Sequence, residues 1–379
     1  MKQYKIFLRN FIFMTLAISS VIVTLCIIAD PYEIWHIYSR QGFNLYSVKG
    51  RKVERLTKPL NFILHNKNSQ TIIFGSSRAD FAMNPKHWEN LTGRKTYNFA
   101  VTNTTVYEMR RYLEYSATND KNLQEIILCV DFYSFVDTPE EDILKILPYK
   151  DEKTFEESLP SLSNVQKVLF SWDAIKDSYN NCKQNSKKMY DYPCHNLDGK
   201  YSEKHIENLY GKDNSKFFKI FNFWKKKINF SEVALKNSAF EDFQKIVELC
   251  AKNNLKLHVC ILPLYPVQYE CFNDCWNIYE EWKIRLSETA PIYDFTYFDK
   301  DLIQPENFWD SSHAKLIIGD KILNSIHSEK LEFGEIVTPE NVKQHNKKIL
   351  RQRKIWRKNH LTEIKQLEKQ LKNSKRSTN

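Results

Sequence analysis

The chain has 379 residues, of which 42% are hydrophobic and eight are glycine, so it can build a large core but is poor in glycine-rich phosphate-binding loops. Its net charge of +10 lies at one end, because residues 341–379 hold 13 Lys/Arg and 2 Asp/Glu while the rest is nearly neutral. This distribution disfavours a uniformly basic nucleic-acid-binding domain.

The first 40 residues have the pattern of a membrane anchor. The run Phe11–Ala29 contains 19 residues without a charge, enough to cross a bilayer core of about 30 Å as a helix. Basic residues precede the run and the next one is Arg40, which places residues 1–10 in the cytoplasm and the body outside. A cleaved signal peptide is the alternative, but residues 26–31 offer no small-x-small site. We therefore expect an uncleaved single-pass anchor in the cytoplasmic (inner) membrane, with the body in the periplasm or outside the cell.

The middle of the chain alternates short apolar runs with helical patterns. After a connector at residues 30–70, the predicted strands are 71–74, 96–101, 125–130, 255–262 and 292–295, and the helices are 104–116, 240–252 and 277–287. Residues 138–235 are polar and aromatic, with helical stretches around 165–179 and 216–227, which indicates a helical insertion covering the sheet. The alternation predicts an α/β domain over residues 71–330 with a mostly parallel sheet and helices on both faces.

The eight cysteines show no CxxC spacing and no familiar metal-binding pattern. Cys182 and Cys194 are twelve residues apart, and Cys271 and Cys275 are four apart. Outside the cytoplasm these two pairs are candidates for disulfide bonds. The alternative is that the cysteines are free and pack as small hydrophobic residues.

A serine motif follows the first predicted strand. In a parallel sheet the site lies at the carboxyl ends of the strands. Residues 75–78 (Gly-Ser-Ser-Arg) occupy such an end, where a serine hydroxyl meets backbone N–H groups that can bind an oxyanion. The motif is weak by itself, because a serine at the end of a strand is usually a turn or capping residue.

A second motif follows the last predicted strand. Asp310 and His313 are three residues apart, so the carboxylate can orient the imidazole while the imidazole reaches a serine. The alternative is a solvated loop. The position after the last strand favours a catalytic set of Ser77, His313 and Asp310, which needs no metal and no nucleotide cofactor.

The order Gly-x-Ser after the first strand and Asp-x-x-His after the last resembles the SGNH, or GDSL-type, hydrolase superfamily. The resemblance implies a three-layer α/β/α sandwich with Ser77 as nucleophile, His313 as base and Asp310 as its partner, while Ser76 takes the place of the usual Asp. A longer string of motifs is similar to a group of bacterial membrane-anchored SGNH-like proteins of uncharacterised function, namely residues 30–32, 73–78, 97–100, 107–113, 130–135, 281–283, 309–313 and 319–320. More distantly, the chain resembles envelope proteins that acetylate or alanylate exported polymers beside a membrane-bound acyltransferase.

Two positions depart from the superfamily pattern. Asn103 takes the place of a glycine whose N–H binds the oxyanion, so the N–H groups of Ser77 and Asn103 are the expected donors. Asp131 takes the place of an Asn, and an ionised carboxylate cannot donate a hydrogen bond. Because one lost donor costs about 10²–10³ in rate, these departures imply slow or absent activity unless another donor serves.

Three further residues are expected to line the cleft and contact substrate: Arg78, Asp131 and Tyr265, which all lie at or after the ends of predicted strands. A salt bridge is the alternative role for Arg78. His258 lies inside a predicted strand and is expected to be a core or rim residue.

Residues 335–379 predict a basic helical tail that is partly amphipathic. Such a helix fits contact with anionic lipid headgroups, an acidic glycan or a partner protein, and the alternative is a solvated, partly disordered helix. Nucleic acid is not an expected partner of a body outside the membrane.

Two functions stay open at the level of sequence. The first is a membrane-anchored serine esterase or acyltransferase that acts on an envelope polysaccharide, with a membrane-bound acyltransferase as partner. The second is a catalytically weak or inactive module that binds glycan or scaffolds a biosynthetic complex. The distance from Ser77 Oγ to His313 separates them, because opposite faces would exclude the enzyme.

Overall fold

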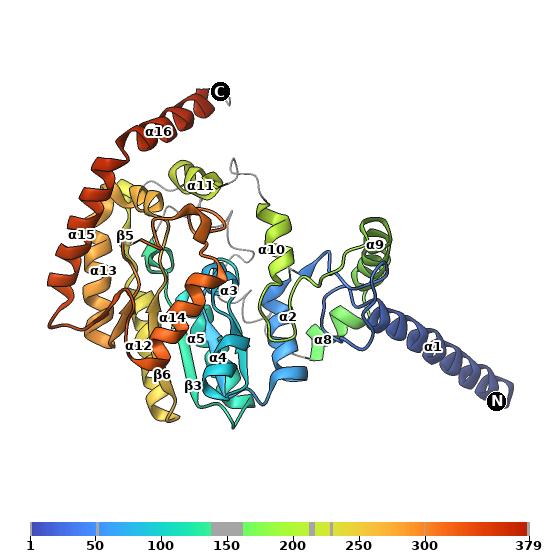
Figure 1. Cartoon of the computed structure of the whole chain (residues 1–379). Helices are drawn as coiled ribbons and strands as arrows, with labels where there is room; N and C mark the ends of the chain where they lie inside the picture. The colour runs from blue at the N-terminus through green and yellow to red at the C-terminus, as the bar shows by residue number, and fades with distance from the viewer. Residues whose placement is uncertain are drawn as a thin grey trace. The chain divides into compact units, whose positions relative to one another are not determined.

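The computed structural model describes residues 2–50, 53–137, 162–211, 217–227, 230–298 and 300–376, and the chain forms two compact units (Figure 1). Unit 1 comprises Met1–Asn66 and Asp151–His205, and unit 2 comprises Lys67–Lys150 and Ile206–Asn379. Unit 1 thus combines most of the expected connector with part of the expected insertion. The other parts of that insertion at 138–161, 212–216 and 228–229 lie outside the described residues.

Unit 2 is built on a six-stranded sheet in the order β2-β1-β3-β6-β7-β8. Its strands are β1 (Thr71–Phe74), β2 (Thr96–Asn98), β3 (Glu125–Cys129), β6 (Lys256–Ile261), β7 (Ile292–Asp294) and β8 (Glu335–Val337). All neighbours are parallel except β7 and β8. The predicted α/β class with a mostly parallel sheet is therefore confirmed. The prediction lacked β8, because a strand of three residues is too short to show a period.

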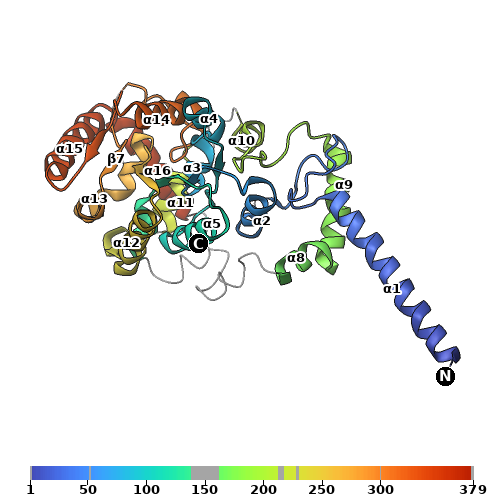
Figure 2. The same ribbon diagram turned by 90° about the horizontal axis from the view of Figure 1, so that it is seen from below.

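Helices lie on both sides of this sheet, as Figure 2 shows from below. Their bounds are α3 (Ser77–Ala82), α4 (Pro85–Thr92), α5 (Val106–Asn119), α12 (Asn237–Lys252), α13 (Trp276–Thr289) and α14 (Leu316–Ser328). On one side α5 packs against α12, and on the other α3 and α4 pack against α14. A capping box between Thr105 and Glu108 begins α5 at the end of the loop that carries Asn103.

Gly319 permits an unusually close approach of α14 to α3. A Cβ atom at this position would lie 1.7 Å from the carbonyl oxygen of Ala82, at the end of α3. Only glycine leaves room for that backbone contact. The contact matters because α3 begins at Ser77 and α14 begins three residues after His313.

The described part of the expected insertion is largely helical. It contains α8 (Leu162–Leu169), α9 (Trp172–Lys188), α10 (Glu203–Tyr210) and α11 (Lys219–Lys227), with a 3₁₀ turn, η5 (Phe230–Glu232). Two short antiparallel strands, β4 (Val136–Asp137) and β5 (Ala234–Leu235), pair with each other at the two ends of the expected insertion.

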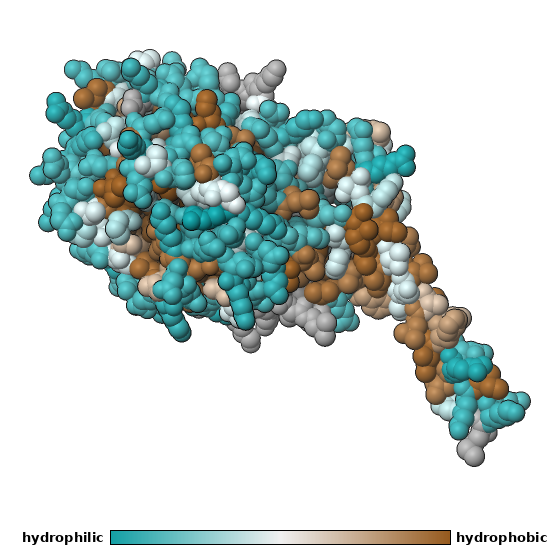
Figure 3. Space-filling model, turned by 60° about the horizontal axis from the view of Figure 1, so that its bottom comes forward, coloured by the Kyte–Doolittle hydropathy of each residue, from teal (hydrophilic) through white to brown (hydrophobic). Residues whose placement is uncertain are grey.

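Unit 1 contains the N-terminal helix α1 (Lys2–Ala29), which is long and apolar enough to cross a membrane. Figure 3 shows apolar side chains along most of this helix and polar ones at its free end. After α1, the Asp30 carboxylate accepts hydrogen bonds from the N–H groups of Ile34, Trp35 and His36, which fixes the turn out of the helix. Helix α2 (Glu54–Asn61) and a short π-helical segment, η2 (Phe62–Asn66), form the end of the N-terminal stretch of unit 1.

The basic tail forms α15 (Val342–Asn359) and α16 (Leu361–Arg376). Helix α15 packs against α13, with His345 fully buried between Asp294 (2.9 Å) and Glu335 (3.2 Å). Arg353 is also buried and lies 3.1 Å from Glu270. Since opposite charges hold its inner face, α15 is an integral part of unit 2.

No disulfide joins the eight cysteines, all of which lie in the described ranges, and seven of them are buried. Burial raises the pKa of Cys250 and of Cys275 to about 12. At ordinary pH these thiols stay protonated, as expected of cysteines that pack as small hydrophobic residues.

Candidate active site

The first strand of unit 2 ends in a tight turn that presents Ser77. Gly75 follows β1, and a Cβ atom there would lie 2.6 Å from the Ala79 Cβ and 2.9 Å from the Cys129 Cβ, so a larger residue does not fit. Ser76 caps α3, since its hydroxyl accepts the Arg78 N–H at 3.2 Å. Ser77 is therefore the first residue of α3, at the carboxyl edge of the sheet.

Ser77, His313 and Asp310 form a hydrogen-bonded chain. The Ser77 Oγ lies 2.9 Å from the His313 Nε2, and the His313 Nδ1 lies 2.9 Å from both carboxylate oxygens of Asp310. With Nδ1 donating to the carboxylate, Nε2 is the free acceptor for the serine proton, which is the arrangement that a general base requires. The structure thus brings together the three residues that the sequence nominated as catalytic.

The Asp310 carboxylate is held rigidly. Its Oδ1 accepts the N–H groups of Ser312 at 2.7 Å and His313 at 2.9 Å, and the side chain is fully buried. The Asp-x-x-His spacing therefore closes a turn in which one carboxylate orients both the backbone and the imidazole of His313.

Asp131 and Arg78 form a buried ion pair next to the nucleophile turn. One Asp131 oxygen accepts from the Arg78 guanidinium and the other accepts from the Ser76 hydroxyl. The same guanidinium donates to the carbonyl oxygens of Leu262 and Pro263, the latter at 3.1 Å. Arg78 thus forms the salt bridge that was its alternative role. Both oxygens of Asp131 and the guanidinium of Arg78 are hydrogen-bonded to other groups of the protein.

Asn103 lies in the loop after β2, where its φ of 53° places it in the left-handed region that glycine favours. Asn is among the few other residues that adopt this conformation readily. The Val101 N–H bonds to the carbonyl oxygen of Gly75 at 2.9 Å, which ties this loop to the nucleophile turn. The backbone at Asn103 therefore adopts a conformation that glycine and asparagine accommodate most readily.

Aromatic rings surround the imidazole. The Phe81 ring centroid lies 4.6 Å from that of His313, and the Tyr210 centroid lies 5.9 Å from it. Tyr265 is buried between Phe217 and Phe308, its N–H bonds to the Ser311 carbonyl oxygen at 3.1 Å, and burial raises its pKa to about 12. Tyr265 therefore contacts the Asp310–His313 loop through its backbone. Phe81 and Tyr210 were not nominated from the sequence, because no motif marks them.

Gln268 is another residue that the sequence did not indicate. It is fully buried, accepts the Ser311 hydroxyl at 2.7 Å and donates to the Tyr133 hydroxyl at 3.1 Å. It therefore connects the Asp310–His313 loop with the segment that follows Asp131. A single glutamine in a 3₁₀ segment, η6 (Pro266–Cys275), carries no local sequence signal.

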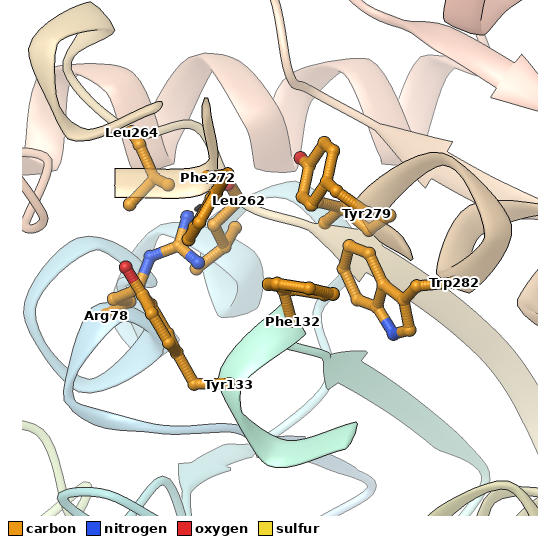
Figure 4. A pocket seen from close by; sticks show the side chains of 9 residues that line it. Arg78, Phe132, Tyr133, Leu262, Leu264, Phe272, Tyr279 and Trp282 are labelled. Carbon is orange, nitrogen blue, oxygen red and sulfur yellow. Dashed lines mark hydrogen bonds between the residues drawn. The ribbon is translucent and has the colours of Figure 1, made fainter. Parts of the chain in front are cut away.

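A small cavity lies beside Arg78, as Figure 4 shows. It is lined by Arg78, Phe132, Tyr133, Ile261, Leu262, Leu264, Phe272, Tyr279 and Trp282. The cavity volume is about 10 Å³, which is room for one water molecule at most. The cavity is too small to hold an acyl chain or a sugar.

One cluster in unit 1 has residue types that ligate metals. Atoms of Glu33, Cys194 and His195 lie within 4.8 Å of one another, and all three residues are buried. The Glu33 oxygens already accept the N–H groups of Ser47, Cys194 and His195. Burial nevertheless raises the Glu33 pKa to about 7. The carboxylate thus has a structural role in holding three chain segments together.

No protein-family model matches the chain, and no curated protein is similar to it in sequence. The function is therefore inferred from the chemistry of the site.

Proposed function

We propose that this chain is a membrane-anchored serine esterase or acyltransferase of the SGNH type. The observation that carries the proposal is the hydrogen-bonded chain from the Ser77 hydroxyl through His313 to the buried Asp310. A hydroxyl, an imidazole and an oriented carboxylate in this order are the groups that activate a serine for acyl transfer. Helices on both faces of the sheet support the three-layer α/β/α sandwich of that superfamily.

The chemistry follows from these groups. Ser77 Oγ attacks the carbonyl carbon of an ester while its proton passes to His313 Nε2, and Asp310 stabilises the resulting imidazolium. The tetrahedral oxyanion collapses, and the alcohol leaves with the proton from His313, which forms an acyl-serine. Water or a polymer hydroxyl then attacks the acyl group and yields the acid or the transferred ester. No step requires a metal or a nucleotide.

The site has few hydrogen-bond donors to stabilise the oxyanion. The backbone N–H groups of Ser77, at the start of α3, and of Asn103 are the donors in this proposal. Asp131 supplies none, because both of its oxygens already accept hydrogen bonds. We therefore expect turnover that is slower by about 10²–10³ than with a full set of donors.

The proposed setting is the outer side of the cytoplasmic membrane. The apolar helix α1 and the basic residues that precede its apolar run support an anchor with its N-terminus inside. An envelope polysaccharide is the proposed acceptor, and a membrane-bound acyltransferase is the proposed source of the acyl group.

The second candidate is a non-catalytic module that binds glycan or scaffolds a biosynthetic complex. The Asp131–Arg78 ion pair favours it, because the pair occupies the place where the superfamily has a neutral donor. A buried ion pair of this kind also stabilises a turn without any catalysis.

A membrane-impermeant fluorophosphonate tests both the chemistry and the setting. Spheroplasts of cells that produce the full chain are treated intact and after lysis, as wild type and as Ser77→Ala, His313→Ala and Asp310→Asn. We expect intact spheroplasts to label the wild type, Ser77→Ala to give no label, and the other two variants to label at least about a hundredfold more slowly. Labelling only after lysis would contradict the setting, and a folded wild type that never labels would favour the second candidate.

A further inference from the structure

The corner between α8 and α9 packs against the end of α1 within unit 1. Both helices contact α1. Cys26 of α1 shares a small core with Val168 and Ala174, and Ile22 packs against the same core. Asn181, about two turns further along α9, donates to the Ala29 carbonyl oxygen at 3.3 Å. The start of α9 therefore shares a core with Ile22 and Cys26, and a later turn reaches the end of α1.

The corner exposes large apolar side chains that do not contribute to this core. Trp172 is 78% exposed and Phe170 is 44% exposed. On α1, Val21 and Leu25 are each 59% exposed. Figure 3 shows an apolar surface along most of α1, up to the point where the helix meets the rest of unit 1. An apolar surface that continues a membrane-spanning helix is expected to be covered by the same lipid.

The polar groups around the corner fit a lipid–water interface. Ser171 caps α9 by accepting the Ala174 N–H at 3.0 Å, and its hydroxyl donates to the Lys167 carbonyl oxygen at 2.7 Å, so the backbone of the turn is satisfied. Lys167 and Lys176 are exposed on either side of Trp172. Trp beside Lys is typical of interfacial segments, because the ring lies at the headgroup level while the ammonium reaches water or phosphate.

We propose that the α8–α9 corner, residues 169–172, is a second membrane contact, which lies in the lipid–water interface where α1 leaves the bilayer. The apolar run Phe11–Ala29 ends where Asp30 begins the turn out of α1, and the polar side chains of Asp30, Asp177 and Asn181 are buried there, since they cannot lie in hydrocarbon. The interface therefore lies near this end of α1, against which α8 and α9 pack.

Two contacts would restrict how unit 1 tilts and rotates about α1, which a single helix cannot do. The proposal depends on α1 crossing a bilayer and not on any catalytic role of Ser77. Depth measurements therefore test it even if the site in unit 2 proves inactive.

The test measures the depth of spin labels on the full chain in lipid nanodiscs. The background carries Cys182→Ser, because Cys182 is the one partly exposed cysteine among the eight. Single cysteines replace Phe170 or Trp172 at the corner. Leu16, 64% exposed on α1, is the deep reference, and Met189, 54% exposed just beyond the other end of α9, is the aqueous reference. For each label, collision with oxygen, which concentrates in lipid, is compared with collision with a water-soluble nickel chelate.

We expect the labels at 170 and 172 to give depths between those at 16 and 189. Accessibility at 170 and 172 equal to that at 189 would overturn the proposal, because the corner would then lie in water. Depths equal to that of the Leu16 label would also overturn it, since the corner would then lie in hydrocarbon. A water-exposed label at 16 would also overturn the proposal, because α1 would then not cross the bilayer. Melting curves of each labelled protein establish that the fold is retained.

Discussion

At the scale of single residues, Asp131 sets the character of the candidate site. Its carboxylate accepts from Ser76 and Arg78, and the pair is almost fully buried. A buried charge is stable only while its partner is present, so neither residue can change alone without cost. The same pair supports the turn that presents Ser77, because Ser76 is both the cap of α3 and a partner of Asp131.

Asp131→Asn would give the site the side chain that the superfamily usually has. We nevertheless expect lower stability, by about 3 kcal/mol, and slower fluorophosphonate labelling, because Arg78 then lacks its counter-charge. Melting temperature and labelling rate are measured on the same samples. The double variant Arg78→Met/Asp131→Leu is the control and should recover part of the stability. Faster labelling at unchanged melting temperature would show instead that Asp131 only weakens an otherwise ordinary oxyanion site.

At the scale of elements, the packing of α3 against α14 sets the distance between the nucleophile and the base. Helix α3 starts with Ser77, and α14 starts three residues after His313. The two helices approach so closely at Gly319 that the Ala82 carbonyl occupies the space of a side chain. The separation of Ser77 and His313 therefore depends on a residue outside both motifs.

Gly319→Ala tests this dependence. In an unconstrained helix the change would stabilise by about 1 kcal/mol. Here the added methyl meets the Ala82 carbonyl, and we expect a loss of about 1–3 kcal/mol together with slower labelling of Ser77. Ile317→Ala is the matched control on the same helix, because Ile317 is 56% exposed and its loss should change stability by less than about 0.5 kcal/mol. A Gly319→Ala protein as stable and as reactive as the wild type would contradict the argument.

At the scale of the whole molecule, Glu125 joins the elements at the end of the sheet away from the site. Its carboxylate lies 3.0 Å from the Trp88 Nε1, 3.0 Å from Arg94 and 3.0 Å from the His258 Nε2. Burial raises the Glu125 pKa, but the hydrogen bond and charge of His258, with Trp88 and Arg94, outweigh burial and hold the pKa at about 2. His258, expected as a core or rim residue, is accordingly buried in this cluster.

The lowered pKa predicts an acid-sensitive contribution to stability. A carboxyl group whose pKa is lower in the folded than in the unfolded chain stabilises the fold above its unfolded pKa of 4.5. That contribution is lost as the pH falls towards 2. We expect Glu125→Gln to lower the melting temperature markedly at pH 7 and much less at pH 3. Glu241→Gln is the control, because Glu241 is an exposed carboxylate on α12 and its loss should change the melting temperature little at either pH. A difference that grows on acidification would contradict the prediction.

The sequence by itself determined the parts of this protein that depend on local pattern. Apolar runs of four to eight residues predicted β1, β3 and β6 nearly to the residue, and the long uncharged run predicted α1. The helical spacing over 104–116 predicted most of α5. The order of Ser77 after the first strand and His313 after the last also indicated one edge of the sheet, because the ends of parallel strands converge there.

Only the tertiary structure decided what depends on contacts between distant segments. The partner of Arg78, the aromatic rings on His313 and the bridge through Gln268 each join residues more than 40 positions apart. No period or motif records such pairs, since each side chain alone is typical of a core or a loop. The division into two units has the same cause, because α8 and α9 pack against α1 although the chain between them forms strands of unit 2.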